Sequence, residues 1–534
     1  AQEHPDLVSL ASIGKSHEGR DIWCVTVTNA ETGPAEDKPA FWCDGNIHAS
    51  EVSACSAVLR ILDILCREKP AVLDERAFYL VPRLGPDGAE WALEDPPRIV
   101  RSGTRHYPYQ EEEIEGLERQ DLDGDGKILT MRVPDPNGPW VVSEEDSRLL
   151  RKRKPGEKSE QAYRLLPEGL IHGWDGQTVK MRRQPQGLDF NRNFPYDWSA
   201  EPDQAGAGHY PGSAPETRAV MEFAARHPHI FTWLNLHTFG GVLIRPLGDK
   251  PDSKMDPTDL AIYRQVESWL GEHTGYACVS GYHEFLYEPD KPLHGDITEW
   301  AYHHRGALAY VIELWDLFAQ LGIERRKPFV EHYWKLDRKD FHALAKLDRE
   351  KNAGRVFKRW RKVPHDQLGE VEVGGFDGRV GIWNPPYEML ADTCAAQSAA
   401  FLRVAALLPR VTVEVVKTEC RGAHTRVEVR IGNAGYLPTY GLSSAKRLPH
   451  AEPLRVTYET RGAKVVAPAE AVLPVGHLEG WGTGLYNGSS IFMPWTRGNE
   501  HEKFVTLVTE GRGTLTIKVG SCRVGYRTVM VDVG

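Results

Sequence analysis

Residues 41–51 read Phe-Trp-Cys-Asp-Gly-Asn-Ile-His-Ala-Ser-Glu: an apolar run, a Gly-Asn turn signal, and then a His and a Glu. An apolar segment with helical spacing follows at residues 52–65. We therefore predict a strand, a tight turn and the start of a helix. Because positions i and i+3 share a helix face, His48 and Glu51 are expected to point at one spot. An imidazole nitrogen and a carboxylate oxygen suit a zinc ion.

A catalytic zinc needs a further protein ligand and keeps one position open for water. Residues 233–241 read Trp-Leu-Asn-Leu-His-Thr-Phe-Gly-Gly and repeat the pattern of an apolar strand that ends in His, here His237. Residues 309–315, Ala-Tyr-Val-Ile-Glu-Leu-Trp, place Glu313 inside an apolar run. A carboxylate buried without a partner costs several kcal/mol, so this position indicates a metal, a cation or a catalytic task.

In this order the segments resemble the zinc metallocarboxypeptidases, the family of carboxypeptidase A and carboxypeptidase T. The resemblance covers most of the first 320 residues outside a polar insertion. Four signatures carry it, His-Ala-Ser-Glu at 48–51, Asn-Arg-Asn-Phe-Pro at 191–195, Leu-His-Thr at 236–238 and Ile-Glu-Leu-Trp-Asp at 312–316, and residues 12–22 are similar to the family's opening strand and turn.

The resemblance implies a zinc site made of His48, Glu51 and His237, with Glu313 as the general base. It also implies that Asn191 and Arg192 hold the free C-terminal carboxylate of the substrate. This role suits the side chains, because a guanidinium group presents a fork of donors to a carboxylate.

Three further roles follow from the resemblance alone. The family's arginine that polarises the substrate carbonyl falls at Arg182, with Arg183 as the alternative. The tyrosine that lies over the substrate is assigned to Tyr287, with Tyr282 second. Thr298 matches the specificity position, and since acids flank it in the sequence, the preferred C-terminal residue of the substrate stays open.

Composition limits the class of protein. The chain has 534 residues with a net charge of −10 and a pI of about 6.1, so we expect no nucleic-acid partner. No run of apolar residues is long enough to span a bilayer, so we expect no membrane insertion. The chain starts without Met, so a processed, secreted or periplasmic form stays open.

The pattern of predicted elements divides the chain in two. Residues 1–408 alternate strands and helices, which predicts an α/β catalytic domain with a mixed sheet flanked by helices and an insertion at about 96–180. A helical, charged stretch is expected at 338–351. Residues 409–534 carry short alternating strands separated by turns, which predicts a β-sandwich.

The insertion contains a candidate calcium loop. Residues 121–128 read Asp-Leu-Asp-Gly-Asp-Gly-Lys-Ile, so Asp121, Asp123 and Asp125 take the first three acidic positions of such a loop. Position 12 is Arg132 rather than the usual bidentate Glu. A calcium site that borrows a ligand from elsewhere and a metal-free turn both remain open.

The sequence thus predicts a zinc-dependent hydrolase that removes C-terminal amino acids from peptides. One alternative is an amidase of the same fold that acts on cell-wall peptides or acylated amino acids. A pseudoenzyme would be expected to lack Glu313 or a zinc ligand. A non-catalytic, calcium-dependent binding protein would leave the zinc set unexplained. The sequence indicates no oligomeric state.

Overall fold

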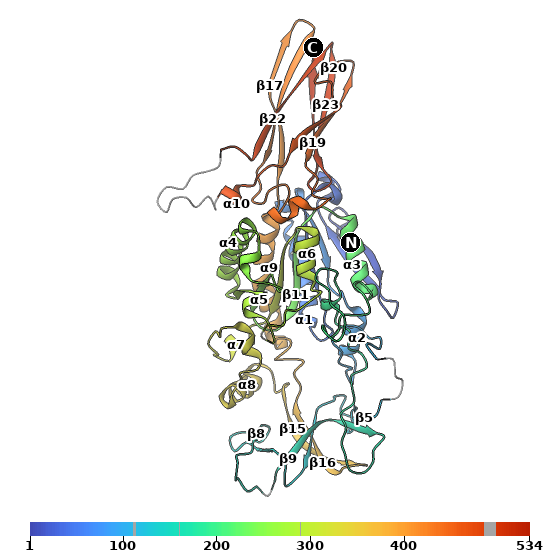
Figure 1. Cartoon of the computed structure of the whole chain (residues 1–534), viewed down its shortest axis with the longest axis vertical. Coiled ribbons are helices and arrows are strands. Elements are labelled where there is room, and N and C mark those ends of the chain that lie inside the picture. Colours follow the sequence, from blue (N-terminus) through green and yellow to red (C-terminus); the bar gives the residue numbers. More distant parts are fainter. Residues whose placement is uncertain (110–113, 160, 289, 485–497) are drawn as a thin grey trace.

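A computed structural model describes residues 1–109, 114–159, 161–288, 290–484 and 498–534 (Figure 1). The molecule is elongated. A body of helices around a sheet occupies the middle, the C-terminal strands form one end, and a smaller sheet forms the other end (Figure 1). The described helices include none that is long and apolar enough to cross a bilayer.

The body is built on an eight-stranded sheet with the order β1-β2-β4-β3-β11-β14-β12-β13. Strands β3, β4, β11 and β14 run parallel to one another, and β13 runs parallel to β12. The pairs β1–β2, β2–β4 and β12–β14 are antiparallel, which confirms the mixed sheet. The strands span Val8–Lys15 (β1), Asp21–Val27 (β2), Ala40–Gly45 (β3), Ala77–Val81 (β4), Ile230–Thr238 (β11), Val242–Arg245 (β12), Ala277–Ser280 (β13) and Leu308–Leu314 (β14).

Helices cover both faces of this sheet, so its central strands β3 and β11 are buried along their whole length instead of alternating between buried and exposed residues. Along β3, Phe41 and Cys43 belong to one core and Trp42 to the other, as the two-residue period of a strand requires. The first core packs against α1 (Val52–Glu68), α4 (Pro257–Thr274) and α9 (Tyr387–Ala406), and the second against α3 (Pro215–Arg226) and α6 (Ile297–Arg305).

The small sheet at the far end joins two distant segments. The expected insertion supplies β6 (Thr130–Pro134), β7 (Trp140–Val142), β8 (Leu150–Lys152) and β9 (Tyr163–Pro167). Strands β15 (Phe357–His365) and β16 (Gly369–Phe376) complete the order β15-β16-β6-β9-β7-β8. The insertion is therefore not a self-contained unit within the chain. Strands β5 (Gly116–Arg119) and β10 (Gly169–His172) form a separate pair.

The connection from the body back to this sheet is helical. It includes α7 (Leu317–Gln320) and α8 (Arg338–Lys351), and α8 confirms the predicted helix at 338–351. The shorter helices α2 (Pro86–Leu93), α5 (Gly281–Glu284) and α10 (Trp481–Gly484) lie elsewhere along the chain.

The C-terminal strands form a β-sandwich. Two antiparallel four-stranded sheets, β17-β18-β22-β20 and β21-β19-β23-β24, share one hydrophobic core. Val429 and Leu507 line that core from the first sheet, and Val456 and Ile517 from the second. The strands span Val411–Arg421 (β17), His424–Asn433 (β18), Leu454–Arg461 (β19), Lys464–Ala467 (β20), Val472–Gly476 (β21), Glu502–Glu510 (β22), Gly513–Ser521 (β23) and Gly525–Val533 (β24).

Candidate active site

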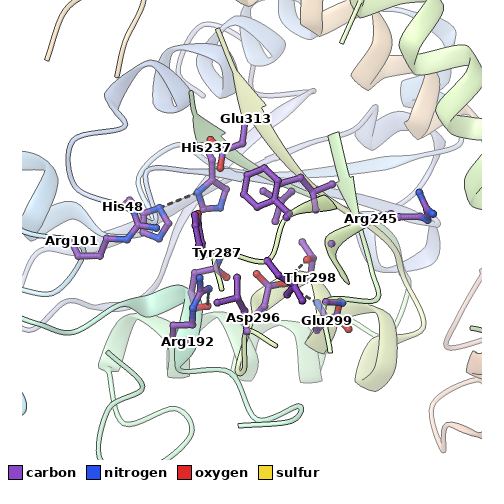
Figure 2. A pocket seen from close by; sticks show the side chains of 18 residues that line it. His48, Arg101, Arg192, His237, Arg245, Tyr287, Asp296, Thr298, Glu299 and Glu313 are labelled. Carbon is purple, nitrogen blue, oxygen red and sulfur yellow. Dashed lines mark hydrogen bonds between the residues drawn. The ribbon is translucent and has the colours of Figure 1, made fainter. Parts of the chain in front are cut away.

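Most of the predicted site residues line one pocket at the carboxyl ends of β3, β11 and β14, and Glu51 contacts two of them, His48 and His237. In open α/β sheets, ligands bind in crevices outside these strand ends. Figure 2 shows the imidazoles of His48 and His237 close together and Glu313 beside them, with Arg192, Thr298 and Glu299 farther down the same pocket.

Three side chains that can bind a metal converge at the top of the pocket. Glu51 Oε1 lies 2.9 Å from His48 Nδ1, and Glu51 Oε2 lies 3.0 Å from His237 Nδ1. The two Nδ1 atoms are 3.1 Å apart, and all three side chains are buried. Ligands of a tetrahedral zinc ion lie about 3.4 Å from one another, because each metal–ligand distance is about 2.1 Å. The donor set and its spacing therefore fit a zinc ion.

The turn that carries the first two ligands differs from the prediction. His48 precedes α1, and Glu51 is the N-cap residue of that helix, so the two do not share a helix face. A turn brings them together instead, closed by a 3.3 Å hydrogen bond from the Glu51 N–H to the His48 carbonyl. Asn46, with a φ of 59°, donates its side-chain amide to the His48 carbonyl and fixes the turn.

Each imidazole is oriented through its other nitrogen. His48 Nε2 lies 3.2 Å from Asp189 Oδ1, and His237 Nε2 lies 2.5 Å from Asn235 Oδ1. The Asn235 amide in turn donates to Asp44, whose pKa is raised to about 7 by burial. Such outer partners fix the tautomer and leave Nδ1 free to bind a metal.

Glu313 projects from β14 next to the triad, because it pairs in parallel register with His237 of β11. Its Oε2 atom is buried and has no hydrogen-bond partner among the described residues. Burial, together with the nearby Glu51 carboxylate, raises the pKa of Glu313 well above its usual range, and the Arg101 charge opposes this. A carboxylate held in this way is suited to exchanging a proton with a reactant.

A short 3₁₀ turn, residues 190–192, presents Asn191 and Arg192 to the lower pocket. Asp189 caps this turn by accepting the Asn191 N–H at 2.8 Å. Burial disfavours the ionised Asp189, but Arg101 and His48 hold its pKa well below the usual range. Asp189 therefore links the triad to the turn as an anion.

The first 321 residues match the family model described as zinc carboxypeptidase. The chain belongs to the zinc carboxypeptidase family. Residues 410–532, the sandwich, match a model described as a domain of unknown function.

Individual relatives of this zinc carboxypeptidase family member are distant. A zinc carboxypeptidase of Saccharothrix mutabilis subsp. capreolus is 32% identical over 98 residues, 17% of this chain and 22% of that one. Carboxypeptidase A4 of Mus musculus is 22% identical over 338 residues, 59% of each chain. The chain thus spans less than two thirds of either relative. The solved complex of bovine thrombin-activatable fibrinolysis inhibitor with tick carboxypeptidase inhibitor has a TM-score of 0.41 and 16% identity, covering 76% of this chain and 91% of that one.

The arginine beside the triad is Arg101, which the sequence analysis missed. Its Nε donates to Asp189 at 3.1 Å and its Nη1 to Glu51 at 3.4 Å. The structure does not bring Arg182 to the site. Arg182 forms an ion pair with Glu118 in the inserted segment and does not line the pocket. The strands β5 to β10 lie between Arg101 and the 189–192 turn, so these two segments of the pocket are far apart in the sequence.

Arg183, the alternative, also lies outside the pocket, with its guanidinium over the Tyr109 ring. Tyr287 lines the pocket and is 45% exposed, whereas Tyr282 does not line it. Thr298 lines the lower pocket in the first turn of α6, and its hydroxyl donates to the N-cap residue Asp296 at 2.5 Å. The structure thus favours Tyr287 over Tyr282 as the pocket tyrosine.

The carboxylates of the Asp-rich loop, residues 121–128, bind donors of the protein itself. Asp121 accepts the N–H groups of Gly124 and Gly126, and Arg361 forms ion pairs of 2.6 Å with both Asp123 and Asp125. Arg361 comes from β15, the strand that joins the insertion from far along the chain. A guanidinium group therefore balances two of the three carboxylates of the candidate calcium loop.

Proposed function

We propose that this chain is a zinc-dependent carboxypeptidase, which removes single amino acids from peptides with a free C-terminus. The observation that carries the proposal is one pocket lined by both His ligands of the two-His, one-carboxylate set, by Glu313, and by Asn191 with Arg192. Among the described residues, Glu313 Oε2 has no hydrogen-bond partner. An amidase of the same fold would not need the last pair, which is suited to a free carboxylate. The proposal includes no calcium ion.

His48, Glu51 and His237 would hold the zinc ion, which when bound supplies Lewis acidity to the scissile carbonyl and to a water molecule. Glu313 accepts the proton of the attacking water on its carboxylate and returns it to the leaving amine. Arg192 and Asn191 bind the terminal carboxylate, so the last peptide bond of the substrate is positioned beside Glu313.

In the same proposal Arg101 takes the part first assigned to Arg182. Its guanidinium lies next to Glu51, where negative charge would develop on the scissile carbonyl oxygen. Tyr287 would close over the substrate from the exposed rim of the pocket, and Thr298 would contact the side chain of its last residue.

Mass spectrometry on matched peptides tests the proposal. One half of the set has free C-termini and the other half carries C-terminal amides, each with and without a zinc chelator. We expect loss of single C-terminal residues from the free peptides only, and no loss when the chelator is present. Cleavage of the amidated peptides would contradict the proposal and point to an amidase or endopeptidase.

Arg192→Ala adds a test of the terminal-carboxylate contact. We expect kcat/KM on free-carboxylate peptides to fall by about 10²-fold, since a charge-assisted contact is worth roughly 2–3 kcal/mol. The zinc content should stay at the wild-type value, because Arg192 is not one of the proposed zinc ligands. A near-normal kcat/KM on free-carboxylate peptides would mean that Arg192 does not bind the terminus.

Glu313→Gln tests the general base. The amide has nearly the same shape but cannot accept the proton, so turnover should fall by at least ~10²-fold while the zinc content stays at the wild-type value. Zinc content by elemental analysis is the control. Near-normal turnover would remove Glu313 from the mechanism.

A further inference from the structure

A second group of metal-binding side chains lies behind the wall of the pocket. Glu299 and His303 lie one turn apart on α6, and Asp249 comes from the segment that follows β12. Their potential ligand atoms lie within 4.8 Å of one another. The proposed peptidase mechanism uses none of these three residues.

The facing atoms of this group have no hydrogen-bond partner among the described residues, although solvent does not reach them. These atoms are Asp249 Oδ1, Glu299 Oε2 and His303 Nε2. Glu299 is only 5% exposed, so its free oxygen is an unpaired acceptor in the interior. A buried carboxylate oxygen without a partner is costly, and a bound cation would offset this cost.

The other polar atoms of the group are engaged, and they hold the ligand atoms in place. Glu299 Oε1 accepts the Gly248 N–H at 2.6 Å. Asp249 Oδ2 accepts the Tyr196 hydroxyl at 3.2 Å and pairs with Lys250 at 3.0 Å, which leaves Oδ1 facing the group. The Tyr196 ring stacks on the His303 ring with centroids 3.7 Å apart.

The distance between the His303 and Glu299 ligand atoms fits a shared metal ion better than a direct hydrogen bond. His303 Nε2 lies 3.5 Å from Glu299 Oε2, which is long for a hydrogen bond but close to the separation of about 3.4 Å between two ligands of a tetrahedral zinc ion. One imidazole and two carboxylates suit zinc, whereas calcium takes six to eight oxygen ligands. The His303 side chain keeps 21% exposure, which offers an entry path from solvent.

We propose that Asp249, Glu299 and His303 bind a second zinc ion, separate from the His48–Glu51–His237 centre. This ion would tie the segment after β12 to α6. Because Gly248, Thr298 and Glu299 all line the substrate pocket, it would fix the wall of that pocket rather than take part in the reaction. The inference does not depend on the proposed peptidase activity.

Zinc counting tests the site. The full chain is incubated with excess zinc chloride, freed of loose metal by gel filtration, and measured by elemental analysis. We expect two equivalents in the wild type and one in His303→Phe, which keeps a ring against Tyr196 but removes the nitrogen. His304→Phe, the matched control on the same helix, should keep two.

Variants of the first centre separate the two sites. His48→Phe should retain one equivalent, and His48→Phe combined with His303→Phe should retain none. If His303→Phe does not fold, Glu299→Gln answers the same question and should retain one equivalent. One equivalent in the wild type, or two in folded His303→Phe or Glu299→Gln, would overturn the proposal whether or not the protein cleaves peptides.

Discussion

At the residue scale, the two candidate arginines differ in where the structure places them: Arg101 lies beside the zinc ligands, and Arg182 lies outside the pocket. His48 and Glu51 follow the end of β3, and His237 lies near the end of β11; each belongs to a short motif of neighbouring residues. The pocket arginine has no such local pattern. The resemblance favours Arg182 because an apolar residue precedes it, and it does not point to Arg101, which lies before the inserted strands.

The two arginines give a direct prediction. Arg101→Ala should lower kcat/KM by about 10²–10³-fold, the usual effect of removing a group that stabilises developing negative charge. Arg182→Ala, which removes only the partly exposed pair with Glu118, should stay within about twofold of wild type. Steady-state kinetics on one free-carboxylate peptide compares them.

Arg101 also holds Asp189, the partner of His48, so its removal could act through the metal. Zinc content is therefore measured in the same preparations, and we expect Arg101→Ala to keep its zinc. A full loss of activity in Arg182→Ala with normal activity in Arg101→Ala would restore the original assignment.

At the scale of elements, the junction of β3 with α1 positions the first two zinc ligands. This junction needs Gly45, because a Cβ atom there would lie 2.8 Å from the backbone carbon of Ala54 and 2.9 Å from its oxygen. Neither backbone atom can move without displacing the helix that Glu51 caps. The Gly-Asn signal in the sequence thus marks a close approach as well as a turn.

Gly45→Ala should therefore lower the free energy of unfolding by about 1–3 kcal/mol, the range for overpacking in a filled interior. It should also weaken zinc binding, because α1 must shift away from β3. Gly271→Ala is the control, since this helical position in α4 has only a 3.6 Å contact, and there the change should stabilise by about 0.5–1 kcal/mol. Denaturant unfolding measures both, and equal stabilities would refute the packing argument.

Local periodicity in the sequence predicts two parts of the fold: the alternating strands and helices of the body, and the short strands of the sandwich. The small sheet at the far end was not predictable in this way. Its central pairing joins Arg132 of β6 to Glu372 of β16, far apart in the chain, and the two side chains also form a 2.7 Å ion pair. A single sequence carries no local signal for such a partner, so the pairing of the insertion with β15 and β16 is not predictable from it.

At the scale of the whole molecule, the sandwich is anchored to the strands that carry the site. Arg523, fully buried between the two parts, donates to the carbonyls of Pro228 and Ile230 and to that of Gly306. Ile230 begins β11, and Gly306 lies just before β14. The sandwich therefore caps the ends of β11 and β14 opposite the pocket (Figure 1).

Arg523→Ala should lower the free energy of unfolding by about 2–4 kcal/mol, because it leaves buried carbonyls without donors and removes a cation from the face of the Phe231 ring, 4.3 Å away. Arg426→Ala, on the exposed face of β18, is the matched control and should change stability by no more than about 0.5 kcal/mol.

Denaturant unfolding is followed by circular dichroism and, in parallel, by zinc release. If Arg523 couples the two parts, zinc release and loss of structure shift together to lower denaturant. A shift in circular dichroism with unchanged zinc release would show that the sandwich unfolds alone and does not support the site.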